Sequence, residues 1–400
     1  MTSLHDRRAT VTGVGLVTAF GPNATETWAA VRDGRSAVRL VDLEGTRVLG
    51  APAPTLDDAE EHNVAMALVA AREALVDAHL RPDDLPQGRT ACTVSSSKGG
   101  MKSLFALHRG FLEEGTAPAG LWPLVSPAAP GAAVARAMGI TGPVVNYAAA
   151  CATGLHAVIA GAQLIASGEV DVVLAGATDA SLVLPLVAAF DRMGVLSRRL
   201  DDPEHAARPF DRTRDGFVIG EGAAVLVLEA GERARGRSYA RVAGTAWGAD
   251  AYDLARVKNA HSAIGPLVKQ ALARAGKTPA QVDYINAHGT GTAANDPTEA
   301  TAIREALGDA ADGVPVSSLK ASVGHLLGAA GGVELALTLL AMRDGFLPPT
   351  LNLTDADPAC DLHHIIGGGI TREVRTAVKI SAGFGGHIGI VVLERGERSG

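Results

Sequence analysis

Residues 144–166 read VVNYAAACATGLHAVIAGAQLIA, and this stretch decides the fold class. Its first part, Val144–Ala149, is predicted to be a strand, and residues 147–166 contain no Asp, Glu, Lys or Arg. That second part is long enough to span a membrane, but it consists mostly of alanine and glycine and includes His156 and Gln163. We therefore expect a helix buried in a protein core, entered by a sharp turn from a strand.

The second half of the chain repeats this order. Residues 315–343, PVSSLKASVGHLLGAAGGVELALTLLAMR, predict a strand over Pro315–Leu319, a glycine turn and a helix over Leu326–Arg343. Strand-like and helix-like segments alternate almost throughout, which is typical of α/β proteins. Two copies of one arrangement suggest an internal duplication. We expect an N-terminal half, residues 1–245, and a C-terminal half, residues 246–400, that share an interface.

The remaining segments fit this plan. Apolar periodicity predicts helices over Val64–His79 and Ser262–Ala275. Further strands are expected at Val11–Val17, Ala91–Val94, Val170–Ala175, Val225–Glu229, Arg241–Thr245 and Asp283–Asn286.

Composition narrows the class of protein. The 36 basic and 43 acidic residues give a net charge of −7, which argues against nucleic acid as a partner. Three cysteines, Cys92, Cys151 and Cys360, cannot form a disulfide framework, and Met1–Gly13 lacks the apolar core of a signal peptide. We expect a cytoplasmic protein that is not embedded in a membrane.

Ala150–Gly154, with the sequence ACATG, places Cys151 where the strand turns into the buried helix. The positive end of the helix dipole and the unpaired N–H groups there would favour the thiolate and hold an oxyanion. Free cysteine is also a common packing residue, and composition alone leaves both interpretations open. Cys92 and Cys360 lack such surroundings, so we interpret them as packing residues.

Two of the twelve histidines occupy equivalent places in the two halves. His288 in Asn286–Thr292 and His325 in Lys320–His325 each follow a predicted strand and lie beside glycine. Ligands bind at the carboxyl ends of strands in open α/β sheets. The shared placement favours a functional pair over two unrelated core or surface residues.

Other motifs are weaker. Cys360, His363 and His364 have no second pair of ligands after them, so we expect no metal site. Gly383–Gly386 lacks the helix and lysine of a phosphate loop, which argues against nucleotide binding. Three arginines, Arg208, Arg212 and Arg214, are either solvated charges or form structural pairs with Asp211, Asp215 and Glu221.

Five segments together resemble the elongating β-ketoacyl-acyl-carrier-protein synthases of fatty acid and polyketide assembly, in collinear order over nearly the whole chain. They are Ala150–Gly154, Arg208–Phe217, Asn286–Thr292, Lys320–Gly331 and Gly383–Gly386. The resemblance implies a thiolase-type fold with a duplicated five-layer αβαβα architecture. It also implies that the protein works without a cofactor and forms a dimer. The implied partner is an acyl carrier protein that carries acyl and malonyl thioesters.

The resemblance gives Cys151 the role of the nucleophile that takes an acyl chain from a carrier thioester. His288 and His325 would support decarboxylation of a malonyl extender and stabilise its enolate, because imidazole N–H donors stabilise a developing oxyanion. Lys320 and Glu334 would organise the charges around them. Phe384 matches the mobile gate beside the cysteine, and Phe190 matches a second aromatic gating position. The backbone N–H groups of Phe384 and Cys151 would form the oxyanion hole. The residues matching the closed end of the acyl pocket are Leu104 and Phe105, and Phe105 is expected to limit acyl length.

The sequence departs from the family pattern in two places. His387-Ile388 follows the Gly-Phe-Gly-Gly run where Thr-Asn is common, which puts the usual hydrogen bonds of the gate loop in doubt. Asp253 stands where a histidine is common, in a segment that looks shortened up to about His261. These changes favour a specialised biosynthetic branch over a housekeeping fatty-acid enzyme.

The main hypothesis is therefore decarboxylative Claisen condensation by a homodimer or by a heterodimer with a ketosynthase-like subunit. A carrier-dependent acyltransferase that forms an ester or amide would keep Cys151 without needing malonyl decarboxylation. A non-catalytic partner subunit would lack the active cysteine, so Cys151 argues against it.

Overall fold

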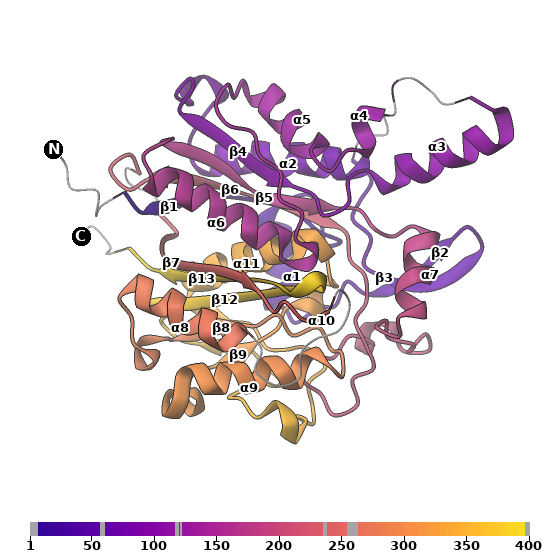
Figure 1. Cartoon of the computed structure of the whole chain (residues 1–400). Coiled ribbons are helices and arrows are strands. Elements are labelled where there is room, and N and C mark those ends of the chain that lie inside the picture. The colour runs from indigo at the N-terminus through magenta and orange to yellow at the C-terminus, as the bar shows by residue number, and fades with distance from the viewer. Residues whose placement is uncertain are drawn as a thin grey trace.

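A single nine-stranded sheet runs through the computed structural model, which describes residues 7–56, 61–116, 120, 122–234, 238–253 and 263–396. In spatial order its strands are β4 (Thr90–Ser95), β5 (Val172–Asp179), β6 (Gly222–Ala230), β1 (Ala9–Val17), β7 (Ala240–Ala249), β13 (His387–Glu394), β12 (Thr376–Gly383), β8 (Tyr284–Asn286) and β9 (Val316–Ser317). β1 and β7 share only two residue pairs, Thr10 with Arg241 and Val11 with Ala240. The sheet divides at this narrow junction into two parts, which lie on either side of two central helices (Figure 1).

The helices form three layers around these two parts. α6 (Thr153–Ala166) and α11 (Ala330–Asp344) lie between them. α2 (His62–Asp77) and α5 (Ala129–Met138) cover the outer face of the first part, and α8 (Ile264–Ala275) and α9 (Asn295–Leu307) cover that of the second (Figure 1). The resulting order of helix, sheet, helix, sheet and helix is the αβαβα architecture that the resemblance implies.

The central helices are buried on all sides. Every residue of α11 from Ala330 to Met342 is buried, and α6 is buried over most of its length. The predicted core helix is thus confirmed over Thr153–Ala166. No helix in the described ranges has the length and apolar character needed to cross a membrane.

The predicted strand Val144–Ala149 is wrong. Only Val144 forms a bridge, to Cys92 of β4. The N–H of Val145 still donates to the carbonyl oxygen of Cys92 at 2.9 Å. Beyond it, the N–H of Tyr147 donates to the hydroxyl of Ser95 at 3.1 Å and that of Ala149 to the hydroxyl of Thr153 at 2.9 Å. The chain therefore leaves the sheet edge early to reach the centre of the molecule.

Both central helices begin in the same way. A 3₁₀ turn, η3 (Ala150–Ala152), precedes α6, and another, η7 (Leu327–Ala329), replaces the predicted start of α11. The first residue of each turn has a positive φ, 47° at Ala150 and 50° at Leu327, which is strained for a residue with a side chain. The repeat in the sequence thus has a structural counterpart. Residue 245 itself lies within β7, and the division of the chain into two halves there stays a prediction.

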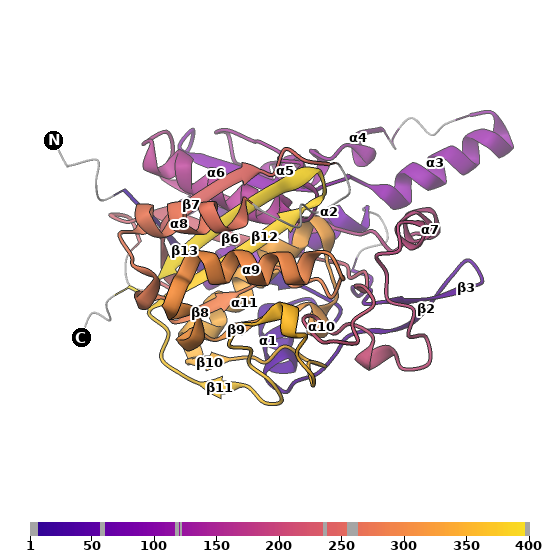
Figure 2. The same cartoon turned by 60° about the horizontal axis from the view of Figure 1, so that its bottom comes forward.

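One side of the molecule carries projecting elements (Figures 1 and 2). α3 (Met101–Glu114) buries none of its residues and extends away from the body beside α7 (Leu184–Arg192) and the hairpin of β2 (Arg39–Leu43) and β3 (Thr46–Gly50). The remaining short elements are α1 (Ala24–Arg32), α4 (Trp122–Val125), α10 (Lys320–Val323), β10 (Phe346–Leu347) and β11 (Ile370–Thr371).

Candidate active site

A cavity of about 530 Å³ brings the three expected reactive residues together. Cys151 lines it from η3, His288 from the loop after β8, and His325 from the segment that precedes η7. The centroids of the two imidazole rings are 5.5 Å apart. The cavity therefore brings together Cys151, which precedes the central helix α6, and His325, which precedes the central helix α11, with His288, which follows β8 in the second part of the sheet.

The backbone around Cys151 is tightly packed. Cys151 follows the strained Ala150, and its side chain is buried. At Gly383, the last residue of β12, a β-carbon would lie 2.7 Å from the carbonyl oxygen of Ala149 and 2.9 Å from the nitrogen of Cys151. Only glycine permits this approach, and it brings the next residue, Phe384, to the same cavity as Cys151.

The expectation that the helix N-terminus favours a thiolate is wrong for the resting site. Burial raises the pKa of the Cys151 thiol to about 11, although the charges of Lys98 and Lys320 act in the opposite direction. The loss of hydration outweighs the positive surroundings, because a buried thiolate gives up its contacts with water. The resting sulfur is therefore a thiol, which must lose its proton when it reacts.

Both histidines are neutral and have a defined tautomer. Burial first, and then the positive charge of Lys320, hold the pKa of His288 and of His325 well below the usual range. Nδ1 of His288 lies 3.4 Å from the ammonium of Lys320, and Nδ1 of His325 accepts the N–H of Leu327 at 3.3 Å. An ammonium and an amide only donate, so each ring carries its proton on Nε2. The site thus holds two imidazole N–H donors without a formal charge.

Lys320 and Glu334 form a buried pair behind His288. The ammonium of Lys320 donates to Oε1 of Glu334 at 2.6 Å and to the carbonyl oxygen of His288. The side chains of Lys320 and Glu334 are at most 1% exposed. The structure brings the two residues together as the resemblance implies.

The sequence analysis missed a second lysine. Lys379 in β12 donates to Oε2 of Glu334 and, at 3.1 Å, to the carbonyl oxygen of Ala287. It is completely buried. The available signal was a single charge within the otherwise uncharged strand Thr376–Gly383.

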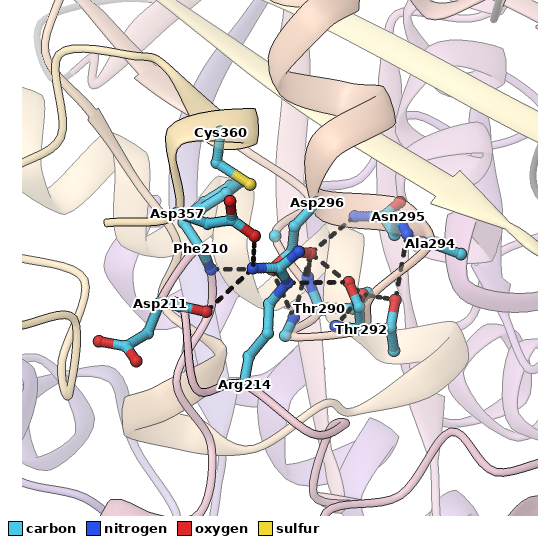
Figure 3. A network of polar contacts seen from close by, with 12 residues as sticks. Phe210, Asp211, Arg214, Thr290, Thr292, Ala294, Asn295, Asp296, Asp357 and Cys360 are labelled. Carbon is cyan, nitrogen blue, oxygen red and sulfur yellow. Dashed lines mark hydrogen bonds and ion pairs between the residues drawn. The ribbon is translucent and has the colours of Figure 1, made fainter. Parts of the chain in front are cut away.

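Two carboxylates of α9, also missed, hold the loop that carries His288. Glu299 accepts the N–H groups of His288 at 2.6 Å and Gly289 at 2.7 Å. Asp296 accepts the N–H of Thr290 at 3.0 Å, and Figure 3 shows it at the centre of the polar network on this loop. Because both carboxylates lie on one rigid helix, they fix the position of His288.

Arg214 joins this loop to two distant segments (Figure 3). Its guanidinium contacts Asp357 at 2.7 Å, Asp296 at 3.8 Å and the carbonyl oxygen of Thr292 at 3.3 Å. Its side chain is only 6% exposed. Arg214 is thus an ion-paired structural residue, and Arg212 pairs with Asp355 at the surface. Neither of them forms an ion pair with the expected carboxylates of Asp211, Asp215 and Glu221.

The two predicted gate residues are in contact. Phe190 of α7 stacks on Phe384 with ring centroids 6.4 Å apart, and it forms a T-shaped pair with Phe217 with ring centroids 5.9 Å apart. Phe217 in turn lies against His325, at 4.9 Å. The aromatic group therefore extends from the gate position to the histidine pair.

The departures in the gate loop have their own hydrogen bonds. Nε2 of His156 forms a hydrogen bond with the carbonyl oxygen of Ile388 at 3.0 Å. The N–H of Asp250 donates to the carbonyl oxygen of Gly386 at 3.0 Å. The ring of His387 meets that of His156 edge-on, with centroids 6.0 Å apart. Asp253 is the last described residue before a gap, and the shortened segment up to His261 lies outside the described residues.

Leu104 and Phe105 do not reach Cys151 within this chain. Leu104 is 37% exposed, and Phe105 lines a separate cavity between α3, the end of β2 and the start of α7. Within one chain α3 projects from the body of the protein, so the expectation that these two residues close the acyl pocket stays a prediction.

Comparison with known proteins identifies the family. Residues 55–234 match the model of the β-ketoacyl synthase N-terminal domain, and residues 239–354 match that of the C-terminal domain. The chain belongs to the β-ketoacyl synthase family.

Relatives of this β-ketoacyl synthase belong to fatty acid pathways and to polyketide pathways. It is 35% identical to 3-oxoacyl-[acyl-carrier-protein] synthase 2 of Coxiella burnetii, over 98% of this chain and 99% of that protein. It is 36% identical to the tetracenomycin polyketide synthase ketoacyl synthase alpha subunit of Streptomyces glaucescens, over 99% of each chain.

Solved structures confirm the thiolase-type ketosynthase fold. A type II polyketide ketosynthase, solved with its acyl-carrier protein and bound to the hexaketide, matches 98% of this chain and 100% of its own with a TM-score of 0.92 at 31% identity. The ishigamide ketosynthase/chain length factor matches with the same coverage, a TM-score of 0.90 and 31% identity.

Proposed function

We propose that this β-ketoacyl synthase joins an acyl group held on Cys151 to a malonyl unit with loss of carbon dioxide, in a specialised fatty acid or polyketide pathway. One observation supports this most strongly. The cavity lined by Cys151 is also lined by two neutral imidazoles, His288 and His325, each with its proton on Nε2. An ester- or amide-forming acyltransferase has no need of two such donors for an enolate.

The first step is transfer of the acyl group. The Cys151 sulfur attacks the carbonyl carbon of an acyl carrier thioester, a new carbon–sulfur bond forms, and the carrier thiol leaves with the proton that Cys151 gives up. The backbone N–H groups of Cys151 and Phe384 would hold the oxyanion that develops. Their roles are supported by the close approach of Gly383 to the nitrogen of Cys151.

The second step forms the carbon–carbon bond. The malonyl carboxylate leaves as carbon dioxide, and its bonding electrons form an enolate whose oxygen accepts the Nε2–H groups of His288 and His325. The enolate carbon then attacks the acyl group, and the Cys151 sulfur leaves and regains a proton. A neutral imidazole donates without forming an ion pair that would hold the malonyl carboxylate in place.

Four further residues would support the reactive residues Cys151, His288 and His325. Lys320 and Glu334 would position His288 through its carbonyl oxygen and Nδ1. Phe384 and Phe190, stacked at the cavity, would gate the acyl chain.

The proposal also covers the protein partners of this chain and its location in the cell. An acyl carrier protein would deliver both thioesters, as suggested by the similar ketosynthase solved with its carrier protein. The chain would act as a homodimer or with a ketosynthase-like subunit, as suggested by the ishigamide ketosynthase/chain length factor. Cys151 would make it the catalytic half of a heterodimer. A cytoplasmic location is supported by its three free cysteines.

Replacement of Cys151 tests the first step. With a panel of acyl-carrier thioesters, the wild-type protein should gain the mass of the acyl group, and Cys151→Ala should gain none, because no other described thiol lines the cavity. Intact-protein mass spectrometry measures the adduct.

Cys360→Ala is the matched control and should still be acylated. Burial raises the pKa of the Cys360 thiol to about 12, and this residue is outside the cavity. An acyl adduct that persists on Cys151→Ala would overturn the proposed function.

A further inference from the structure

Lys379 is a charged side chain in an unusual place. It lies in the middle of β12, pairs with Asn286 of β8 and Val391 of β13, and has no exposed surface. A lysine loses its hydration on burial, and this is tolerated only where partners replace the water. The identity of those partners therefore indicates what Lys379 contributes.

Its partners are those of Lys320. The two ammonium groups bind opposite oxygens of the Glu334 carboxylate, Lys320 at Oε1 and Lys379 at Oε2. They also bind the carbonyl oxygens of two consecutive residues, Ala287 and His288. One carboxylate thus serves two cations, and both cations hold the backbone that carries a reactive histidine.

We propose that Lys379 is a second positioning lysine of the active site, which fixes the backbone of His288 together with Lys320 and supplies a positive charge that keeps both imidazoles neutral. The kinetic part of this proposal rests on the proposed function. Its electrostatic part concerns only this chain.

The charges around Lys379 support this assignment. The titratable groups that face it from the elements packed around β12 are Glu334 on α11, Lys320 on α10, Glu299 on α9, and the imidazoles of His288 and His325. Glu299 is occupied by the N–H groups of its own loop. The charges that act on the two imidazoles include those of Lys320 and Lys379, and a positive charge nearby disfavours an imidazolium.

The directions of the pKa shifts of His288 and His325 agree with this assignment. Burial is the largest cause of the lowered pKa of His288 and of His325, and Lys320 and Lys379 both add to it. Burial lowers the pKa of Lys379 itself to about 8. The charge of Lys379 is therefore present at neutral pH and is lost as the pH rises through that value. Its influence on the histidines should vanish in alkaline solution.

Two substitutions separate hydrogen bonding from charge. Lys379→Gln removes the charge and keeps a donor, and Lys379→Met removes both while keeping the length of the side chain. Without the charge, each histidine gains a proton at a higher pH. Carbon dioxide release from malonyl carrier protein should then show an acidic limb moved up by about one pH unit, with a rate up to about tenfold below wild type on that limb and close to the wild-type rate above about pH 9.

A control and a second readout complete the test. Lys277→Met removes a lysine that pairs with Glu394 outside the cavity, and it should follow the wild-type pH profile. Acylation of Cys151, measured by mass, should be unchanged in both Lys379 variants. A rate that falls by the same factor at every pH would overturn the proposal, because a merely structural role has no pH signature.

Histidine titration by NMR with ¹³C-labelled imidazoles does not depend on the reaction. In Lys379→Gln the signals of His288 and His325 should move toward the protonated shift at a higher pH than in the wild-type protein. Signals that follow the wild-type curve at every pH would overturn the proposal. A wild-type protein that releases no carbon dioxide would instead overturn the proposed function, and the titration would still decide the role of Lys379.

Discussion

At the scale of single residues, the reactive groups are uncharged and the charges stand behind them. Cys151 keeps its proton because burial outweighs nearby lysines, and the two histidines are neutral because burial and nearby lysines act together to lower their pKa values. Lys320 and Glu334 contact His288 from the side of its Nδ1 and carbonyl group. An enolate formed between the Nε2–H donors would therefore be the main new charge in a dry site, where such donors are most effective.

Asp211 supports a residue-scale prediction about stability. Burial raises its pKa, but hydrogen bonds from Thr354, Thr213 and Asp355 outweigh this and lower the pKa to about 2. A carboxyl group with a lowered folded-state pKa stabilises the fold above its unfolded pKa of about 4 and loses this contribution as the pH falls toward 2. Asp211→Asn should lower the free energy of unfolding at pH 7 by about 1–3 kcal/mol, and by less at about pH 3.

Urea denaturation at the two pH values measures this difference. Asp201→Asn, at an exposed carboxyl group, is the control and should change the midpoint little. An Asp211→Asn variant with the same loss at both pH values would contradict the assignment.

At the scale of elements, the crossing of the two central helices sets the distance between the reactive residues. α6 begins two residues after Cys151, at Thr153, and α11 begins at Ala330, shortly after His325. At Gly154 of α6, a β-carbon would lie 2.7 Å from the backbone nitrogen of Gly332 of α11. A larger residue would force the helices apart and move the ends that carry the site.

Gly154→Ala should therefore lower the free energy of unfolding by about 1–3 kcal/mol and slow the acylation of Cys151. Gly110→Ala in α3 is the matched control, because its β-carbon would meet no atom within 4 Å. That change should stabilise the protein by about 0.5–1 kcal/mol, since alanine favours a helix. Equal effects of the two substitutions, measured by denaturation, would contradict the close helix crossing.

The elements also show what the sequence can and cannot predict. α6 and most of the strands follow from uninterrupted apolar runs, which depend on local residues alone. The strand Val144–Ala149 failed because the N–H groups of Tyr147 and Ala149 donate to the hydroxyls of Ser95 and Thr153 instead of to a strand. The resemblance assigned Leu104 and Phe105 to the acyl pocket, but it did not indicate that α3 projects from the body of a single chain, and their role stays a prediction. Lys379 was missed because its meaning depends on where α10 and α11 lie beside β12.

At the scale of the whole molecule, the site exists only where the two parts of the fold meet. Cys151 comes from the segment before residue 245, and both histidines come from the segment after it. The motifs Asn286–Thr292 and Lys320–Gly331 indicated the histidines and their lysine, and the resemblance placed them in one site before any coordinates. The carboxylates of α9 needed the fold, because acidic residues on a helix are ordinarily solvated.

Carbon dioxide release from malonyl carrier protein, measured together with the acyl product, tests the central claim most directly. The account predicts one carbon dioxide for each carbon–carbon bond formed by the wild-type protein. It also predicts that His288→Ala and His325→Ala still acylate Cys151 but lose most of this release. An ester or amide product formed without carbon dioxide, or undiminished release by both histidine variants, would contradict it.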